Sequence, residues 1–197
     1  MRVIETEVPG VLIVEPRVHR DGRGFFVETY HAPRYREHGI ADDFVQDNHS
    51  RSTRGTLRGL HGQYPRAQAK LVRATLGEIF DVAVDARRGS PTYGRFAAAR
   101  LSAGNFRQIY VPPGFVHGFC VTSEVAEVEY KCSVVYHPED EFSVLWNDPD
   151  LGIPWPIESP TLSEKDRRAP RLRDVQERLL VFAFPGTDPG ASGRGRS

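Results

Sequence analysis

The sequence predicts an all-β protein, a barrel or sandwich with a few short peripheral helices. Its 197 residues include 18 Gly and 15 Pro, a composition that favours many turns over long helices. Short apolar runs with strand character recur between turn signals, which is typical of a barrel or sandwich. These runs are VLIVEP, GFFVETY, KLVRATLG, EIFDVAVDA, RQIYVPPG, HGFCVTS, VEYKCSVVY and FSVLW.

The length favours a single domain, because ordinary domains span about 100 to 200 residues. We expect this domain to cover residues 1–183. The last stretch, 184–197, is rich in Gly, Pro and Ser and has little to bury, so it is predicted to be a disordered tail. Helical signals are few: Pro and Gly mark the two ends of 33–39, and one or two short helices are expected within 163–181.

Charge and hydropathy restrict the function classes. With 26 Lys+Arg and 26 Asp+Glu, the chain lacks the basic character of a general nucleic-acid binder, and a small-molecule partner is expected. There is no apolar run of about 18 residues, and MRVIETEVPG lacks the apolar stretch of an export signal, so we expect no membrane insertion and a cytoplasmic protein. Cys120 and Cys132 lie in strand-like runs and are expected to be buried free thiols.

Period-two alternation assigns the side chains of a strand to its two faces. In 128–136, Tyr130 and Tyr136 share a face, so both are expected to look into the same interior. In 115–121, His117 shares a face with Phe115 and Phe119. An imidazole is therefore expected inside, among large apolar groups.

The densest polar cluster is QDNHSRSTRGTLRGLHGQ, 46–63, followed by QAKLVR, 68–73. Its cations make the region locally basic in a neutral protein, as a site for an anionic ligand such as a diphosphate would require. The alternative is a solvated basic loop, which charge alone favours because charge runs usually face solvent. The cations are Arg51, Arg54, Arg58, Arg66, Lys70 and Arg73.

The segment PPGFVH, 112–117, resembles the second half of the signature of cupin barrels. In metal-binding cupins the first half supplies two histidines one residue apart and a downstream carboxylate. The corresponding segment here, LHGQ, has Gln63 in place of the second histidine. His61 and His117 alone are too few ligands for a transition metal, so no metal site is predicted and the histidines are free for proton chemistry.

Eight motifs, in order, make the match specific. They cover most of the chain, from about residue 3 to 181, and are similar to the dTDP-4-dehydrorhamnose 3,5-epimerase family. That resemblance implies a homodimeric cupin jelly-roll without a metal or other cofactor. It also implies proton abstraction and return at C3 and/or C5 of a dTDP-4-keto-6-deoxy sugar, in deoxysugar biosynthesis. The motifs are Q-x-N-x-S from 46, LRGLH from 57, QAKLVR from 68, DVAVD from 81, LSAGNFRQIYVPPGFVHGF from 101, EYKCS from 129, DPDLGIPWP from 148 and LSEKD from 162.

The resemblance implies a role for each matching residue. His61 is similar to the family's general base, Tyr130 to the acid on the opposite face of the sugar, and Asp166 to the carboxylate that holds the base. Lys70 resembles the cation that faces the developing enolate oxygen. The matches to substrate contacts are Arg58, His117, Gln46, Asp47 and Asn48, followed by Arg23 and Glu28, which reach the nucleotide across the dimer, Tyr136, which stacks on thymine, and Glu141 and Lys165.

The residues alone also allow structural roles. His61 could be a hydrogen-bonded core histidine, Lys70 a strand residue whose amine reaches water, and Tyr130 and Tyr136 core aromatics with hydroxyls at the barrel mouth. Asp166 lies three residues after Ser163, which could cap a helix, so Asp166 could be the N3 partner in a capping box. Gly62 departs from the family pattern, in which a bulky side chain is common. We expect the missing bulk to enlarge the pocket beside the base.

Three alternative functions stay open from the sequence. The first is a monofunctional 3- or 5-epimerase that acts on another deoxysugar, for an antibiotic or a polysaccharide. The second is a metal-dependent cupin oxygenase. The third is a non-catalytic cupin that binds sugar nucleotides. The presence of His61, Tyr130 and Asp166 argues against it, because the resemblance gives these residues catalytic roles.

Overall fold

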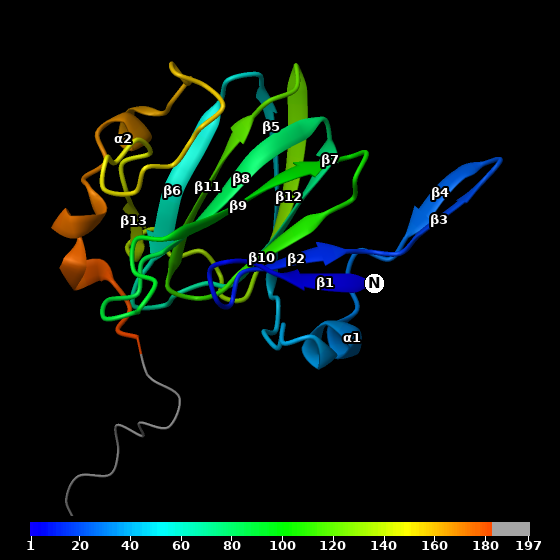
Figure 1. The fold of residues 1–197 in the computed structure, drawn as a ribbon, viewed down its shortest axis with the longest axis horizontal. Helices are drawn as coiled ribbons and strands as arrows, with labels where there is room; N and C mark the ends of the chain where they lie inside the picture. Colours follow the sequence, from blue (N-terminus) through cyan, green and yellow to red (C-terminus); the bar gives the residue numbers. More distant parts are fainter. Residues whose placement is uncertain (183–197) are drawn as a thin grey trace, which may run out of the picture.

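The computed structural model describes residues 1–182 and is built almost entirely from antiparallel strands (Figure 1). Two sheets form the body of the molecule, in the orders β1–β2–β10–β7–β12–β5 and β13–β6–β11–β8–β9. The predicted all-β jelly-roll class is confirmed. The strands of the first sheet are β1 (Arg2–Glu5), β2 (Leu12–Glu15), β10 (Gln108–Val111), β7 (Lys70–Leu76), β12 (Val125–Cys132) and β5 (Gln46–Thr53). Those of the second are β13 (Glu141–Ser143), β6 (Leu57–Gln63), β11 (Phe115–Val121), β8 (Glu78–Asp85) and β9 (Phe96–Ser102).

The main apolar core lies between the two sheets. Val72 of β7 and Val128 of β12 pack in one cluster with Ile79 of β8 and with Phe115 and Phe119 of β11. The burial of these alternating side chains supplies the main drive for the two sheets to pack. His117, on the same face of β11 as the two phenylalanines, is 6% exposed, as the alternation predicted.

Short helices and loops cover the outer faces of the sheets. Tyr35 of α1 (Ala32–Glu37) packs on one side with Val14 and Tyr110. On the other side, Leu172 and Leu179 of the C-terminal segment cover the second sheet. The other helical turns are α2 (Glu164–Arg167), η1 (Leu172–Asp174) and η2 (Gln176–Arg178), so both regions with helical signals are helical. The tail predicted for 184–197 lies outside the described residues.

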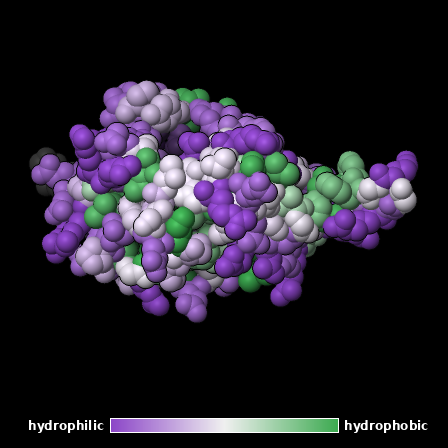
Figure 2. All heavy atoms as spheres, turned by 90° about the horizontal axis from the view of Figure 1, so that it is seen from above, coloured by the Kyte–Doolittle hydropathy of each residue, from purple (hydrophilic) through white to green (hydrophobic). Residues whose placement is uncertain are grey.

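A two-stranded hairpin, β3 (Val18–Asp21) and β4 (Gly24–Val27), projects from the body of the molecule (Figure 1). Its strands pair only with each other. Phe25 and Phe26 on this hairpin are 58% and 70% exposed. In Figure 2 the hairpin extends to the right and carries hydrophobic side chains on its surface. Apolar groups of this size are unusual on an exposed surface.

Two strand runs are shorter than the sequence pattern suggested. β12 ends at Cys132, so Tyr136 lies in the following loop and is 48% exposed. β13 (Glu141–Ser143) covers only the first two residues of the predicted run FSVLW, 142–146. Both cysteines are free and buried. No helix of the described part of the chain is long and apolar enough to cross a membrane.

Candidate active site

A polar cavity lies between the two sheets and is lined from both sides. His61 comes from β6 of the second sheet, whereas Lys70 of β7 and Tyr130 of β12 come from the first. These three side chains line two hollows, of about 310 and 600 Å³. The shared lining makes the two hollows parts of one site. An imidazole and a phenol on opposite walls of one site can address opposite faces of a bound ring.

The base candidate is held by a buried carboxylate. His61 Nε2 lies 2.6 Å from Asp166 Oδ1, and the Asp166 side chain is 4% exposed. Burial raises the pKa of Asp166, but the hydrogen bond and charge of His61 outweigh it, so the pKa falls below its ordinary value. The carboxylate is therefore ionised at neutral pH and can stabilise an imidazolium.

The Asp166 bond determines which His61 nitrogen is available. An ionised carboxylate only accepts hydrogen bonds, so Nε2 must carry the proton and donate it. Nδ1 is then the unprotonated nitrogen, able to take a proton from carbon. The capping alternative is also correct in part: Ser163 Oγ accepts a hydrogen bond from the Asp166 backbone nitrogen at 3.1 Å. The cap fixes the backbone and leaves the carboxylate for His61.

Lys70 is a half-buried cation without an acidic partner among the described residues. No carboxylate of residues 1–182 lies within salt-bridge distance of its amine, which is 5.9 Å from the centre of the Tyr130 ring. Burial lowers the pKa of Lys70 from its ordinary 10.5. A cation held in this way is poised for an anion that enters the cavity.

The Tyr130 phenol is also available to a ligand. Among the described residues no side chain or backbone group forms a hydrogen bond with its hydroxyl. Burial raises the pKa of Tyr130 above its ordinary 10, so the phenol keeps its proton at neutral pH. It can donate that proton to a group across the cavity from His61.

A second histidine–carboxylate pair lies deeper in the cavity wall. His117 Nε2 is 2.9 Å from Asp81 Oδ1, and both side chains are buried. His117 and His61 are cross-strand partners on β11 and β6. Their strands approach closely beside Gly59 and Gly118: a Cβ on Gly59 would come within 2.5 Å of Gly118 Cα. Only glycine permits that approach, which places the two imidazoles side by side along the sheet.

The structure brings most of the predicted contact residues to this cavity. The smaller hollow is lined by Gln46, Asn48, Tyr136 and Glu141, and the larger by Arg58, His117 and Lys165. Tyr136 and Tyr130 do line one interior, although Tyr136 reaches it from a loop.

Asp47 requires a correction. Along β5 the exposures alternate, so Gln46 and Asn48 face the cavity and Asp47 faces the opposite side. Its carboxylate pairs with Lys131 at 2.9 Å and is 73% exposed. The structure therefore does not place the Asp47 side chain in the cavity.

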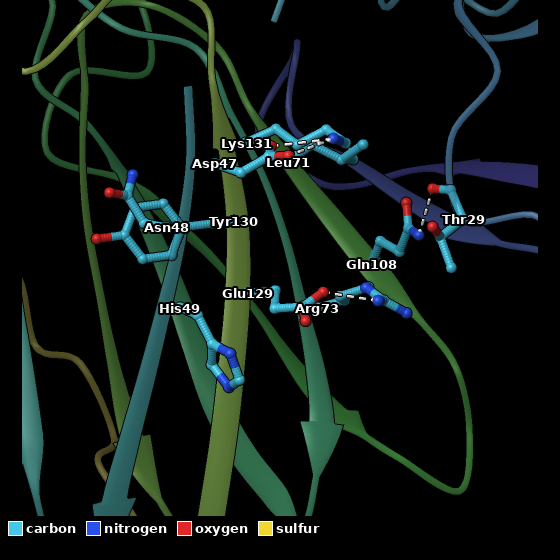
Figure 3. A pocket seen from close by; sticks show the side chains of 10 residues that line it. All are labelled: Thr29, Asp47, Asn48, His49, Leu71, Arg73, Gln108, Glu129, Tyr130 and Lys131. Atoms are coloured by element: carbon cyan, nitrogen blue, oxygen red, sulfur yellow. Dashed lines mark hydrogen bonds and ion pairs between the residues drawn. The ribbon is translucent and has the colours of Figure 1, made fainter. Parts of the chain in front are cut away.

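A separate hollow of about 370 Å³ lies on that outer face (Figure 3). Figure 3 shows Tyr130 and Asn48 pointing to one side of the sheet, and Arg73 and Lys131 to the other. Its charged groups neutralise one another: Arg73 pairs with Glu129 at 2.6 Å, and Lys131 with Asp47. The charged groups of this hollow are therefore paired, unlike Lys70 in the cavity between the sheets.

Arg23 and Glu28 lie away from the cavity in the same chain. Arg23 is at the tip of the projecting hairpin and pairs with Asp21 at 2.6 Å. Glu28 follows β4 and pairs with Arg34. Neither lines the cavity, so one chain alone does not bring them to His61.

The basic run of the sequence is largely neutralised in the fold. Arg51 pairs with Glu127, Arg66 with Asp140 and Glu139, and Arg73 with Glu129. Arg58 instead donates to Ser52 Oγ at 3.1 Å and lines the cavity with Lys70. Arg54 is exposed and lines neither hollow, so Arg58 and Lys70 are the two cations of the basic run that face the cavity.

Two further residues of the site were missed by sequence reasoning. Asp81 begins the motif DVAVD, and a carboxylate in such an apolar strand needs a buried partner, which is His117. Ser50 ends the motif Q-x-N-x-S and lines the larger hollow. Its hydroxyl is the one buried side-chain polar atom of the described residues without a hydrogen-bond partner. A ligand oxygen in the hollow would satisfy it.

The expected enlargement beside Gly62 is wrong. A Cβ on Gly62 would lie 2.6 Å from the ring of Phe142 and 3.0 Å from Val116, so the ring of Phe142 fills the space. Phe142 and Gly62 are direct partners in the β13–β6 ladder. A side chain at position 62 would thus point to the outer face of β6, with Phe142 and Val116 and away from the His61 imidazole, so its absence does not enlarge the cavity.

Comparisons with known proteins identify one family of enzymes. The sequence profile of the dTDP-4-dehydrorhamnose 3,5-epimerase family matches residues 5–174. A dTDP-4-dehydrorhamnose 3,5-epimerase of Pseudomonas aeruginosa is 54% identical over 177 residues, which cover 89% of this chain and 98% of the relative. An epimerase of Escherichia coli is 50% identical over 187 residues, 92% of this chain and 100% of the relative.

Solved structures are equally similar. The crystal structure of a dTDP-6-deoxy-D-glucose 3,5-epimerase from Legionella pneumophila, in complex with dTDP-4-keto-L-rhamnose, superposes with a TM-score of 0.91 at 48% identity, covering 93% of this chain and 99% of that one. A 3'-monoepimerase of Streptomyces bikiniensis in complex with dTDP-quinovose gives a TM-score of 0.83 at 35% identity, over 89% and 91%. The profile, the relatives and the shared fold establish that this chain is an isomerase and belongs to the dTDP-4-dehydrorhamnose 3,5-epimerase family.

Proposed function

We propose that the cavity binds a dTDP-4-keto-6-deoxy hexose and inverts C3, C5 or both by removing and returning a proton beside the ketone. The observation that carries this proposal is the arrangement of His61, held by Asp166, opposite Tyr130, with the unpaired cation of Lys70 in the same cavity. C3 and C5 both flank the C4 carbonyl, so one set of groups can act on either carbon.

His61 Nδ1 removes the proton, and the ionised Asp166 stabilises the imidazolium that forms. Loss of that proton places negative charge on the ketone oxygen, which the ammonium of Lys70 stabilises. Tyr130 then delivers a proton from the opposite wall, and this inverts the centre. The Ser50 hydroxyl and the Arg58 guanidinium can donate hydrogen bonds to the polar parts of the ligand. The His117 imidazole also lines the larger hollow and can contact the ligand; its Nε2 lies against Asp81.

The reaction is tested by NMR of the protein with dTDP-4-keto-6-deoxyglucose in D₂O. We expect deuterium to appear at the carbons beside the ketone together with an inverted product. Two labelled positions mean inversion at C3 and C5, and one means a monoepimerase like the S. bikiniensis relative. Tight binding of dTDP with no deuterium incorporation would support the non-catalytic alternative instead.

The resemblance also supports a homodimer in which the β3–β4 hairpin of one protomer completes the cavity of the other. Arg23 and Glu28 match nucleotide contacts but lie on or beside the projecting hairpin, away from their own cavity. Phe25 and Phe26 give that hairpin an apolar surface to bury. The cytoplasmic location stays a prediction.

The exchange of hairpins is tested by mixing two inactive variants, His61→Ala and Arg23→Ala. If the site is shared, a mixed dimer contains one cavity with both native residues, and the mixture regains part of the activity. If each chain forms its cavity alone, the mixture stays as inactive as its components.

A further inference from the structure

The loop that carries Tyr136 is held by side chains rather than by a strand partner. β12 ends at Cys132, and the backbone of 134–137, whose Tyr136 lines the smaller hollow, lies outside the sheet ladders. A backbone segment without ladder bonds needs other partners for its N–H and C=O groups. Here three glutamine amides from different parts of the chain supply them.

The bonds are made to four consecutive residues. Gln68 Nε2 donates to the carbonyl of Val134 at 2.6 Å, and Gln46 Oε1 accepts from the Tyr136 nitrogen at 2.8 Å. Gln63 uses both ends of its amide: Oε1 accepts from the nitrogen of residue 137 at 3.1 Å, and Nε2 lies 3.5 Å from the carbonyl of residue 135. Gln63 thus brackets Tyr136 on both sides.

Gln63 differs from the other two in its burial and its place. It is 7% exposed, and its Nε2 also donates to the Arg66 carbonyl at 2.6 Å, so its amide is fully engaged. It lies two residues after His61 on β6 and lines the same hollow. The short strand β6 therefore fixes the positions of both the base His61 and the loop that carries the Tyr136 ring.

We propose that Gln63 is a positioning residue for nucleotide recognition, which fixes the Tyr136 ring at a set distance from His61. The inference rests on the proposed function, because it takes Tyr136 as a contact of the nucleotide base. The side chain of Tyr136 has few restraints of its own. Its hydroxyl donates one hydrogen bond, to Glu141 at 3.2 Å, and the residue is 48% exposed. The orientation of its ring depends on the backbone that Gln63 holds.

The test measures the Kd of dTDP by calorimetry for the wild type, Gln63→Met, Tyr136→Ala and the double variant. Methionine has a similar volume but cannot form these hydrogen bonds. We expect Gln63→Met to raise the Kd roughly fivefold to tenfold, the loss of one or two hydrogen bonds. In the Tyr136→Ala background the same change should alter the Kd by less than about twofold, because the two effects act through one contact.

A matched control is Thr92→Val, which removes a buried hydrogen bond to Asp85 elsewhere in the fold, at 2.6 Å. It should lower Tm and leave the Kd of dTDP unchanged. Steady-state rates separate the roles further: Gln63→Met should raise KM more than it lowers kcat. Gln68 is a second anchor of the same loop, so Gln68→Met should raise the Kd of dTDP in the same way, and it tests the inference if Gln63→Met folds poorly.

Several outcomes would overturn the inference. If the wild type binds dTDP and Gln63→Met binds it equally well, Gln63 does not position the nucleotide contact. A full effect of Gln63→Met in the Tyr136→Ala background would show that it acts by another route. Failure of the wild type to bind dTDP would overturn the proposed function itself, and this inference with it.

Discussion

Asp166→Asn should slow catalysis strongly while it preserves the fold. The Asn amide replaces one carboxylate oxygen by an NH₂ group of the same size. If that group faces His61 across the 2.6 Å bond, it donates, so Nε2 must accept and the imidazole proton moves to Nδ1. The nitrogen that should remove the carbon-bound proton then already carries one.

The magnitude follows from the role. A positioned base contributes about 10² to 10⁴ in rate, and the variant also loses the charge that stabilises the imidazolium, so the rate should fall about 10³-fold. Stability should change less. The Ser163 cap on the Asp166 backbone is kept, and one charge-assisted hydrogen bond of about 2 kcal/mol is lost, which lowers Tm by about 4–8 °C.

The assay is the rate of deuterium incorporation into the sugar, followed by NMR, with thermal unfolding beside it. Glu164→Gln is the matched control, because Glu164 lies on the same helix, is exposed, and pairs with Arg168 rather than with His61. It should leave the rate unchanged. An Asp166→Asn rate within about threefold of the wild type would refute the assigned tautomer and the role of the pair.

The pH dependence of stability gives a second readout for this pair. The pKa of Asp166 is below its ordinary 3.8 in the folded state, so the unfolded state binds more protons as the pH falls. The contribution of the carboxylate is therefore complete above the unfolded pKa and is lost as the pH falls through the lower, folded pKa. The Tm advantage of the wild type over Asp166→Asn should shrink in that acidic range. An advantage that grows there would contradict the assigned shift.

Three further predictions concern the opposite wall and the packing behind the base. Lys70→Met should stabilise the fold at pH 7 and raise Tm, because burial disfavours the charged amine, while deuterium incorporation falls at least about 10²-fold. The gain in Tm should shrink as the pH rises toward the unfolded pKa of 10.5; a lower Tm at pH 7 would contradict the assignment. Tyr130→Phe should allow deuterium to enter the substrate without inversion, as measured by NMR, and a normal yield of inverted product would refute Tyr130 as the acid. Phe142→Gly should lower stability by about 2–4 kcal/mol, and Gly62→Phe should also destabilise, since the two side chains compete for one space. The double variant should recover at least about 1 kcal/mol relative to the sum in denaturant unfolding, whereas strict additivity would contradict this packing.

The fold was predictable where strands are apolar on at least one face. The pattern identified β8 and β11 directly, because their buried side chains recur within short runs between turns. It treated β5 as part of a polar cluster. That strand is at the edge of its sheet and reads QDNHSRST, with polar residues at both its exposed and its inward positions, so it lacks an apolar face. Its alternating exposure appears only once its partner β12 is known.

The site was predictable only in part for a different reason. Asp166 and His61 are 105 residues apart in the sequence. Local patterns relate only neighbouring residues, so they cannot predict that a residue in a capped helix contacts a residue in a distant strand. The resemblance to a family brought them together, whereas the residues alone favoured a cap. Asp47 shows the limit of such a transfer: it lies in a matching motif, yet strand alternation turns its side chain away from the cavity.

Packing between strands lies beyond either kind of prediction. The sequence shows that Gly62 lacks a side chain, but not that Phe142, paired with it across the β13–β6 ladder, fills the space. Likewise, the glutamines around Tyr136 come from three separate segments, and only the folded chain shows that they hold one loop.

The central claim is that His61 and Tyr130 act on opposite faces of one sugar ring. The most direct measurement is a crystal structure of the protein with a bound dTDP-linked 6-deoxyhexose. The account predicts His61 Nδ1 and the Tyr130 hydroxyl on opposite sides of the ring, each about 3–3.5 Å from a carbon beside C4, with the Lys70 amine at the C4 oxygen. A ring with both groups on one face, or a sugar bound outside the cavity between the sheets, would contradict it.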